Sequence, residues 1–284
     1  MIAVTGASGQ LGRLVIAALL ERVPAASIVA LARDPAALAD LADAGVDVRA
    51  FDYDRAETLV TALAGVDRLL LISSSDLPNR QRQHQAVIDA AGAAGVGFLA
   101  YTSILHADRN PMDLAVDHRA TEAMLSAGGI PCALLRNGWY TENYAQVAPM
   151  AVEHGAVSGS ARDGRISAAS RADYALAAAT VLTAEPADSR TYELAGDDSF
   201  TLADLARTIG DISGRPVHYH DMPEPEYRTM LEAIGLPTPL AAMLAESDAK
   251  AADGALYDDG HDLSRLIGRP TTPLRDVVAA ALRP

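Results

Sequence analysis

Short apolar segments alternate with longer amphipathic ones through the first half of the chain. The apolar segments are continuous, and they read IAVT, SIVALA, VDVRAF, DRLLLIS, VGFLAYTS and PCALLRN. Continuous apolar runs are typical of strands buried on both faces, as in a parallel sheet. Between the first two runs, apolar residues recur at the spacing of one helix face: Leu11, Leu14, Val15, Ala18 and Leu19. The pattern predicts an α/β fold, a doubly wound parallel sheet with helices on both faces.

The rhythm changes after the segment RNGWYTENY, residues 136–144. A Gly- and Ser-rich segment follows, then a capped helix and a further strand, TYELAG, which we expect to rejoin the main sheet. Beyond it, helices alternate with Pro-rich turns. We therefore expect a main domain over residues 1–145, rejoined by about 165–195, and a smaller C-terminal substrate lobe over 196–284 together with 146–164.

Charge and composition limit which kinds of molecule the protein is expected to bind. The chain carries 23 basic and 37 acidic residues, a net charge of −14. Such a surface repels phosphate backbones and anionic lipids, so we expect neither nucleic acid nor membrane as a partner. No apolar run is long enough to span a bilayer, and the start, MIAVTG, lacks the basic leader of a signal peptide. The single cysteine, Cys132, excludes an internal disulfide and fits a cytoplasmic protein, monomer or homodimer.

A glycine-rich turn lies between the first apolar run and the first amphipathic segment, in the stretch TGASGQLG. Gly6 permits a tight turn, Gly9 leaves room for a pyrophosphate, and Gly12 lets the helix sit close to the strand. The N-terminus of that helix offers free N–H groups and a partial positive charge to phosphates. This strand–turn–helix context predicts a Rossmann dinucleotide-binding domain. The cofactor-binding residues expected here are Gly6, Ala7, Ser8, Gly9, Gln10 and Leu11.

Arg33 indicates which dinucleotide is bound. It follows the second apolar run, where a protein that binds NAD usually carries an acidic residue for the ribose hydroxyls. A guanidinium instead pairs with a 2′-phosphate through two hydrogen bonds and opposite charge. Asp34 comes next, but we expect its side chain to point elsewhere. We therefore predict NADPH as the cofactor, with NADH possible but weaker; a solvated strand end is the alternative interpretation of Arg33.

Two more segments end strands at the same edge of the predicted sheet. Ser73, Ser74 and Ser75 follow LLLI, and their hydroxyls and amides are candidates for the cofactor's ribose. RNGWYTENY follows the sixth run and holds the only tryptophan. We expect its residues to surround the nicotinamide end: Asn137, Gly138, Trp139, Tyr140, Thr141, Glu142 and Asn143. The alternative interpretation of this segment is a hydrogen-bonded loop that docks the small lobe.

Metal chemistry has little support in the sequence. His218 and His220 share one face of a predicted strand, but no third ligand lies at a suitable spacing. No HExxH, CxxC or G-x-S-x-G motif is present. We expect no metal, and we interpret His84 as a packing or capping residue.

Several segments together resemble a known family. TGASGQLG, LARDP, LLLISSS, YTSILHAD and LLRNGWYTENY are similar to those of the NmrA-like atypical short-chain dehydrogenases, and the chain resembles most closely their bacterial flavin-free NAD(P)H:quinone oxidoreductases of the second type. The resemblance covers nearly the whole chain. It implies an NADPH-dependent enzyme that passes a hydride directly to a quinone without flavin. It also implies a cofactor held by residues 6–11, Arg33, the three serines and the 137–142 loop.

One departure bears on the mechanism. Short-chain dehydrogenases usually carry Tyr-x-x-x-Lys, but Leu114 and His118 stand at those positions and the motif occurs nowhere in the chain. A quinone becomes aromatic on reduction and needs little acid help. Water, His118 or Tyr140 could supply the proton, and the two residues could also position the substrate. His118 and Glu122 are i, i+4 neighbours; the carboxylate would raise the histidine's proton affinity, or the two form a surface pair.

The missing motif also suits other functions. An NmrA-like redox sensor binds NADP with little or no turnover, and a reductase or epimerase for another carbonyl compound would need a proton donor that the sequence does not reveal. A sensor needs a partner-binding surface, and the sequence shows no added tail or exposed apolar helix for one. We therefore favour the quinone reductase.

Overall fold

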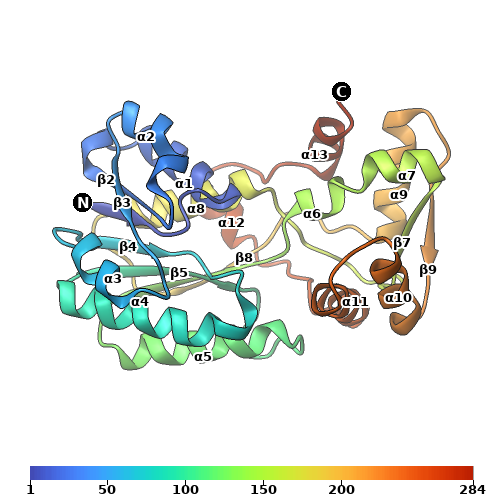
Figure 1. The fold of residues 1–284 in the computed structure, drawn as a ribbon. Helices are drawn as coiled ribbons and strands as arrows, with labels where there is room; N and C mark the ends of the chain where they lie inside the picture. The colour runs from blue at the N-terminus through green and yellow to red at the C-terminus, as the bar shows by residue number, and fades with distance from the viewer. Residues whose placement is uncertain (284) are drawn as a thin grey trace. The chain divides into compact units, whose positions relative to one another are not determined.

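The computed structural model describes residues 1–283, and its strands and helices follow the alternating pattern of the sequence (Figure 1). The strands are β1 (Ile2–Val4), β2 (Ile28–Ala32), β3 (Asp47–Ala50), β4 (Arg68–Leu71), β5 (Phe98–Ile104), β6 (Cys132–Asn137), β7 (Ala156–Gly159), β8 (Thr191–Leu194) and β9 (His218–Asp221). The α-helices are α1 (Gln10–Leu20), α2 (Ala39–Asp43), α3 (Ala56–Ala62), α4 (Arg80–Ala94), α5 (Leu114–Ala127), α6 (Thr141–Ala145), α7 (Ala148–His154), α8 (Arg171–Thr183), α9 (Leu202–Ser213), α10 (Glu224–Ala233), α11 (Thr238–Ala251), α12 (Asp262–Ile267) and α13 (Leu274–Ala281).

Seven strands form one sheet in the order β3-β2-β1-β4-β5-β6-β8. All neighbouring pairs from β3 to β6 are parallel. β8 runs parallel to β6, because the N–H groups of Leu134 and Gly138 donate in step to the carbonyls of Arg190 and Leu194. The predicted α/β fold with a doubly wound parallel sheet is thus confirmed. The strand order reverses between β1 and β4, and ligands of such sheets bind outside the carboxyl ends of the strands at that reversal.

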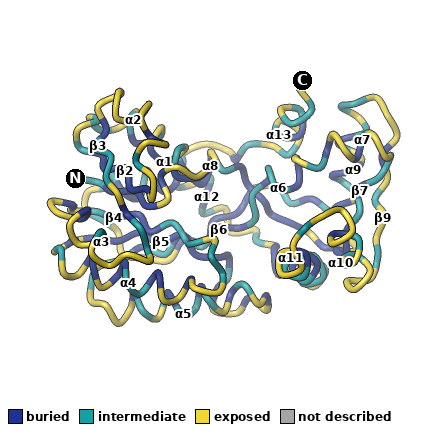
Figure 2. The backbone as a smooth tube through the Cα atoms, in the orientation of Figure 1, coloured by how far each residue is buried: buried dark blue, intermediate teal, exposed yellow. Residues whose placement is uncertain are grey.

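Both faces of the main sheet are covered, which explains the continuous apolar runs. On one face, a core of strand residues packs against α3, α4 and α5; it includes Ala3, Leu31, Leu69, Leu99, Leu59, Val87 and Leu125. The alternate residues of the strands are also fully buried, and they include Ile28, Ala30, Leu70 and Ala100. They point to the opposite face, where α1 packs against β2 and α8 against β4 and β5. The central strands are buried along most of their length (Figure 2).

The chain divides into two compact units. The first comprises residues 1–107, 117–137 and 171–192 and holds nearly all of the main sheet; the remaining residues form the second. In the second unit, β7 pairs with β9 in a parallel two-stranded sheet, and α9 packs against both strands. The domain boundaries expected from the sequence stay a prediction. No helix within residues 1–283 is long and apolar enough to cross a membrane.

Candidate functional site

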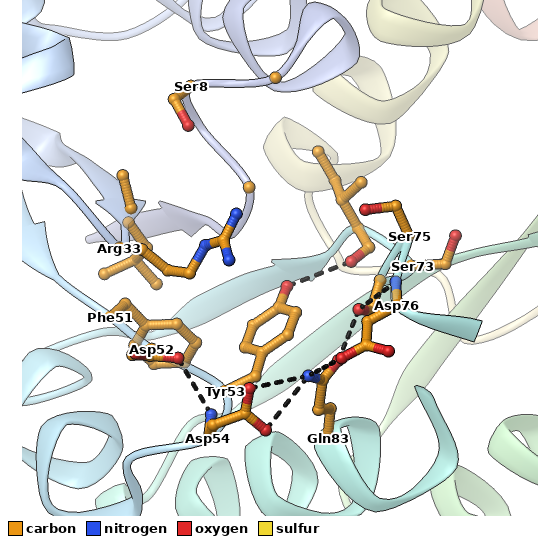
Figure 3. Close-up of a pocket in the computed structure, with 16 residues that line it drawn as sticks. Ser8, Arg33, Phe51, Asp52, Tyr53, Asp54, Ser73, Ser75, Asp76 and Gln83 are labelled. Atoms are coloured by element: carbon orange, nitrogen blue, oxygen red, sulfur yellow. Dashed lines mark hydrogen bonds between the residues drawn. The ribbon is translucent and has the colours of Figure 1, made fainter. Parts of the chain in front are cut away.

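A cavity of about 300 Å³ lies at the carboxyl ends of β1, β2, β3 and β4, beside the reversal of strand order (Figure 3). Most of its walls are segments that follow a strand, and the end of β2 and one residue of α4 complete the lining. The lining residues are Gly6, Ser8, Gly9, Leu31, Ala32, Arg33, Phe51, Asp52, Tyr53, Asp54, Ile72, Ser73, Ser74, Ser75, Asp76 and Gln83. We call this cavity the strand-end pocket.

The glycine turn forms the wall that follows β1. Gly6 has a φ of +58°, a left-handed conformation that favours glycine, and its carbonyl accepts from the Gly9 N–H at 2.9 Å. A Cβ on Gly12 would lie 2.3 Å from the Gly6 oxygen, so only glycine allows α1 to approach this closely. No side chain caps the N-terminus of α1, which leaves its first N–H groups for an anionic ligand.

The predicted residues of this turn divide into two groups. Gly6, Ser8 and Gly9 line the strand-end pocket. Ala7 and Leu11 are buried, and Gln10 begins α1 with an exposed side chain. The cofactor-binding roles expected of Ala7, Gln10 and Leu11 stay predictions.

Arg33 follows β2 and is exposed at the mouth of the strand-end pocket. Of the described residues that line the pocket, it alone carries a basic side chain, and within residues 1–283 it forms no ion pair. Asp34 turns away, as expected, because its carboxylate accepts from the Ala36 N–H at 3.0 Å and caps the short 3₁₀ helix Pro35–Leu38. The guanidinium is thus available to an anion that enters between β1 and β2.

The three serines after β4 lie together on one wall of the strand-end pocket. The Ser73 N–H donates to Thr102 Oγ1 at 2.9 Å, which ties this wall to β5. Thr5 Oγ1 accepts from the Ile72 N–H at 2.9 Å and ties it to the end of β1. Ser74 differs from its neighbours, because its hydroxyl donates to Gln83 Oε1 at 2.5 Å.

Asn137 ends β6 at the same edge of the sheet. Its side chain is buried, with 7% of the residue exposed, and Oδ1 has no hydrogen-bond partner within residues 1–283. A buried acceptor without a partner is costly unless a ligand or water satisfies it. Asn137 is therefore a polar group suited to a ligand at this edge.

The other residues expected around the nicotinamide belong to the second unit. Tyr140 and Ala169 form an isolated parallel bridge, with the Thr141 N–H donating to the Ala169 carbonyl at 2.9 Å. Glu142 lies in the first turn of α6, and the Gly138 N–H donates to the Leu194 carbonyl. The predicted roles of Gly138, Trp139, Tyr140, Thr141 and Glu142 stay predictions.

The expected contact between His118 and Glu122 is wrong. His118 is buried, and its Nδ1 lies 2.8 Å from the hydroxyl of Tyr101. Glu122 binds elsewhere: Arg136 donates to both its carboxylate oxygens, at 2.9 and 2.7 Å, and Ser103 Oγ donates to Oε1 at 2.6 Å. Both residues lie on the face of α5 that packs on the sheet, so strand residues are their partners and neither surface pair nor charge pair forms.

Burial also reverses the expected effect on the histidine. Desolvation, followed by the charges of Arg80 and His84, lowers the pKa of His118 to about 3. His118 is therefore neutral at physiological pH, which is poorly suited to donating a proton. Its expected role, substrate positioning or proton supply, stays a prediction.

The segment that follows β3 forms a wall of the pocket that was not predicted from the sequence. This segment, FDYD, reaches the strand-end pocket at the same edge as Arg33 and the serines. Tyr53 donates from its hydroxyl to the Ile72 carbonyl at 3.2 Å, and burial raises its pKa to about 12. The signal was available, because FDYD directly follows an apolar run, as the serines do.

His84 is also more than a packing residue. It is fully buried, its Nε2 accepts from the Ser74 N–H at 2.9 Å, and its Nδ1 lies 2.9 Å from Thr121 Oγ1. Burial lowers its pKa to about 3, so the ring is neutral and Nε2 remains an acceptor. His84 thereby fixes the serine wall from beneath.

Two further sequence candidates show no site chemistry. Cys132 is half-buried at the start of β6, and burial raises the pKa of its thiol. His218 and His220 lie on β9, and residues 1–283 contain no cluster of His, Cys, Asp or Glu that could hold a metal ion.

A glycine turn at a helix N-terminus, a single cation after the second strand and a pocket at the reversal of strand order define a dinucleotide-binding α/β protein. The chain belongs to the NmrA-like family, whose sequence model matches residues 1–276. Quinone oxidoreductase 2 of Escherichia coli (strain K12) is 51% identical over 279 residues, which cover 98% of both proteins.

Solved structures agree with this placement. A crystal structure of the NADPH-dependent quinone oxidoreductase of Escherichia coli complexed with NADPH matches with a TM-score of 0.97 at 50% identity, over 100% of both chains. The triphenylmethane reductase of Citrobacter sp. complexed with NADP(H) matches with a TM-score of 0.96 at 38% identity, over 99% of this chain and 100% of that one.

Proposed function

We propose that this protein is an NADPH-dependent quinone reductase that transfers a hydride directly to the quinone. The observation that carries the proposal is the 51% identity, over 98% of both chains, to a quinone oxidoreductase. The strand-end pocket supports it, because its glycine turn and Arg33 match a phosphorylated dinucleotide.

The residues of the first unit fit the cofactor along one edge of the sheet. The N–H groups around Ser8 and Gly9 would bind the pyrophosphate at the N-terminus of α1. Arg33 would pair with the 2′-phosphate, the feature that separates NADPH from NADH. Asn137 Oδ1, buried and without a partner in the described chain, would accept from a polar group of the nicotinamide half. When bound, NADPH supplies the hydride.

The site residues support a reaction that needs little acid catalysis. Tyr-x-x-x-Lys is absent, and His118 is neutral. Hydride addition to a quinone restores an aromatic ring, so positioning of the ring can supply most of the rate. No flavin is required for this step. His118 and Tyr140 are proposed to position the substrate, with water as the proton source.

Consumption of NADPH by the purified protein tests this function. We expect the nicotinamide absorbance to fall when a simple benzoquinone is added, at a rate proportional to enzyme and unchanged by added flavin. A protein that binds NADPH but never consumes it would support the redox sensor instead. A rate that depends on added flavin would contradict direct hydride transfer.

A second candidate substrate class is the triphenylmethane dyes. The observation that favours it is the 38% identity and TM-score of 0.96 to a triphenylmethane reductase over the whole chain. Such a dye is a delocalised carbocation, so hydride addition at its central carbon requires no proton, and the net charge of −14 attracts it. Loss of dye colour that depends on NADPH would establish this activity beside quinone reduction.

We also propose a cellular location and a state of assembly. The lone Cys132 and the acidic surface suit a cytoplasmic protein that acts as a monomer or homodimer. Sedimentation at several concentrations measures the assembly.

A further inference from the structure

We propose that Gln83 is a positioning residue that holds two walls of the strand-end pocket, the segments after β3 and β4, in place for the cofactor. The proposal rests on the proposed function in one respect, that the pocket binds NADPH. Gln83 is buried on α4, with 4% of the residue exposed.

The side-chain amide of Gln83 contacts both walls at once (Figure 3). Its Oε1 accepts from the Ser74 hydroxyl at 2.5 Å. Its Nε2 lies 3.2 and 3.1 Å from the two carboxylate oxygens of Asp54 and 3.2 Å from Asp76 Oδ2. Carboxylates only accept, so the amide nitrogen must face them and the oxygen must face the serine.

The topology of the sheet makes this contact necessary. β3 and β4 are not neighbours, because β2 and β1 lie between them. No ladder of backbone hydrogen bonds therefore sets the distance between the segments that follow them. In the described chain, one further hydrogen bond joins the two walls: Tyr53 donates from its hydroxyl to the Ile72 carbonyl. Gln83 bridges the walls directly from the helix beneath.

Ser74 is the anchor of the second wall. Its N–H donates to His84, its carbonyl accepts from Arg80 Nε at 2.7 Å, and its hydroxyl donates to Gln83. Three residues of α4 thus contact the three polar groups of Ser74, and the Asp76 N–H also donates to its hydroxyl oxygen at 3.2 Å. The sequence suggested direct contacts to the cofactor for all three serines. Because the polar groups of Ser74 are already hydrogen-bonded, we assign these contacts to Ser73 and Ser75.

The neutrality of Gln83 matters because its partners are anionic. Arg82 Nη2 also donates to Asp54, at 2.5 Å, and Asn79 donates to Asp76. A carboxylate at position 83 would keep the shape of the side chain but would repel both walls. The charged or titratable groups that line the pocket are Arg33, Asp52, Tyr53, Asp54 and Asp76, and those beside Gln83 on α4 are Arg80, Arg82 and His84.

The test compares Gln83→Glu, Gln83→Met and a matched control, Gln85→Glu. Gln85 lies on the same helix and donates to Asp89 at 2.8 Å on the exposed side. We expect both Gln83 variants to weaken NADP⁺ binding, measured by calorimetry at neutral pH, by about tenfold, and Gln85→Glu to bind as the wild type does.

The pH dependence separates positioning from a general loss of structure. Between about pH 8 and about pH 5.5, the carboxylate introduced by Gln83→Glu gains a proton, donates to Asp54 or Asp76, and recovers part of its affinity relative to the wild type. Gln83→Met, which has no titratable group, stays weak throughout. Wild-type affinity in both variants, or an identical pH profile for both, would overturn the proposal.

Amide hydrogen exchange tests the same proposal without any ligand. We expect Gln83→Glu to speed exchange in residues 52–54 and 73–76 together, with Gln85→Glu unchanged. Unchanged exchange in these segments would overturn the positioning role. If the wild type fails to bind NADP⁺, the proposed function is overturned instead. Amide hydrogen exchange then tests the role of Gln83 by itself.

Discussion

Single residues decide which ligand the strand-end pocket suits. Arg33 and Asp34 are adjacent in the sequence, yet one guanidinium faces the pocket while the neighbouring carboxylate caps a 3₁₀ helix. The pocket also contains Asp52, Asp54 and Asp76, which are unfavourable neighbours for a phosphate. The proposed preference for a 2′-phosphate therefore depends on one positive charge.

We predict that Arg33→Ala weakens NADP⁺ binding by roughly ten- to a hundredfold, the loss of a charge-assisted bidentate contact. NAD⁺ lacks the 2′-phosphate, so its affinity should change by no more than about twofold. Arg22→Ala is the control, because Arg22 is equally exposed but lines no part of the pocket. Calorimetry with both nucleotides measures the effect. Equal losses for NADP⁺ and NAD⁺ would remove the assignment of Arg33.

At the scale of elements, the close approach of α1 to the end of β1 forms the wall of the pocket that we propose binds phosphate. A Cβ at Gly12 would lie 2.3 Å from the Gly6 oxygen and 2.9 Å from Ala7 Cα, both backbone atoms that cannot yield cheaply. Gly92 in α4 has no atom within 4 Å of the same position. A side chain at position 12 would thus collide with the backbone, whereas a side chain at position 92 would meet open space.

We predict opposite effects when each of these glycines is replaced by alanine. Gly92→Ala should raise the free energy of unfolding by about 0.5–1 kcal/mol, since alanine loses less backbone entropy in a helix. Gly12→Ala should lower it by about 1–3 kcal/mol and weaken NADP⁺ binding, because α1 must move away from β1. Denaturant unfolding and calorimetry measure both. A stabilised Gly12→Ala variant with intact binding would contradict the role of close packing.

At the scale of the whole molecule, buried neutral histidines link folding to pH. His84 and His118 both have their pKa lowered to about 3 by burial, against about 6.5 in an unfolded chain. The unfolded chain therefore binds more protons between these values. Their contribution to stability is fully present above about pH 6.5 and is lost as the pH falls toward 3. Asp248 opposes this, because burial raises its pKa to about 6.

We predict that His118→Asn flattens the dependence of stability on pH. In asparagine, Oδ1 takes the place of Nδ1 and can still accept from Tyr101, but it does not titrate. Between about pH 5 and about pH 6.5, the free energy of unfolding should change by about 1 kcal/mol per pH unit less than in the wild type. Denaturant unfolding across this range measures the difference. Asp248 titrates in both the wild type and the variant, so its effect cancels in the comparison. Identical slopes would contradict a buried neutral His118.

The fold and half of the site could be predicted from the sequence because they depend on local signals. Continuous apolar runs require a sheet covered on both faces, and the turn around Gly6 requires a backbone without side chains next to a helix. Arg33 and the serines follow apolar runs directly, so the parallel topology alone brings them to one edge. The FDYD segment follows the same logic, and the sequence could have revealed it.

The sequence by itself thus determined the parallel sheet, the glycine turn, and the placement of Arg33 and the serines at one strand-end pocket. Only the tertiary structure decided that His118 pairs with Tyr101, that Glu122 pairs with Arg136, and that Gln83 bridges two walls. These contacts join residues on a helix face to strands, or to the segments after strands, that lie 9 to 29 positions away in the sequence. Which strand or strand end lies opposite each residue on the buried face of a helix is set by packing in three dimensions, and a local sequence pattern does not reveal it.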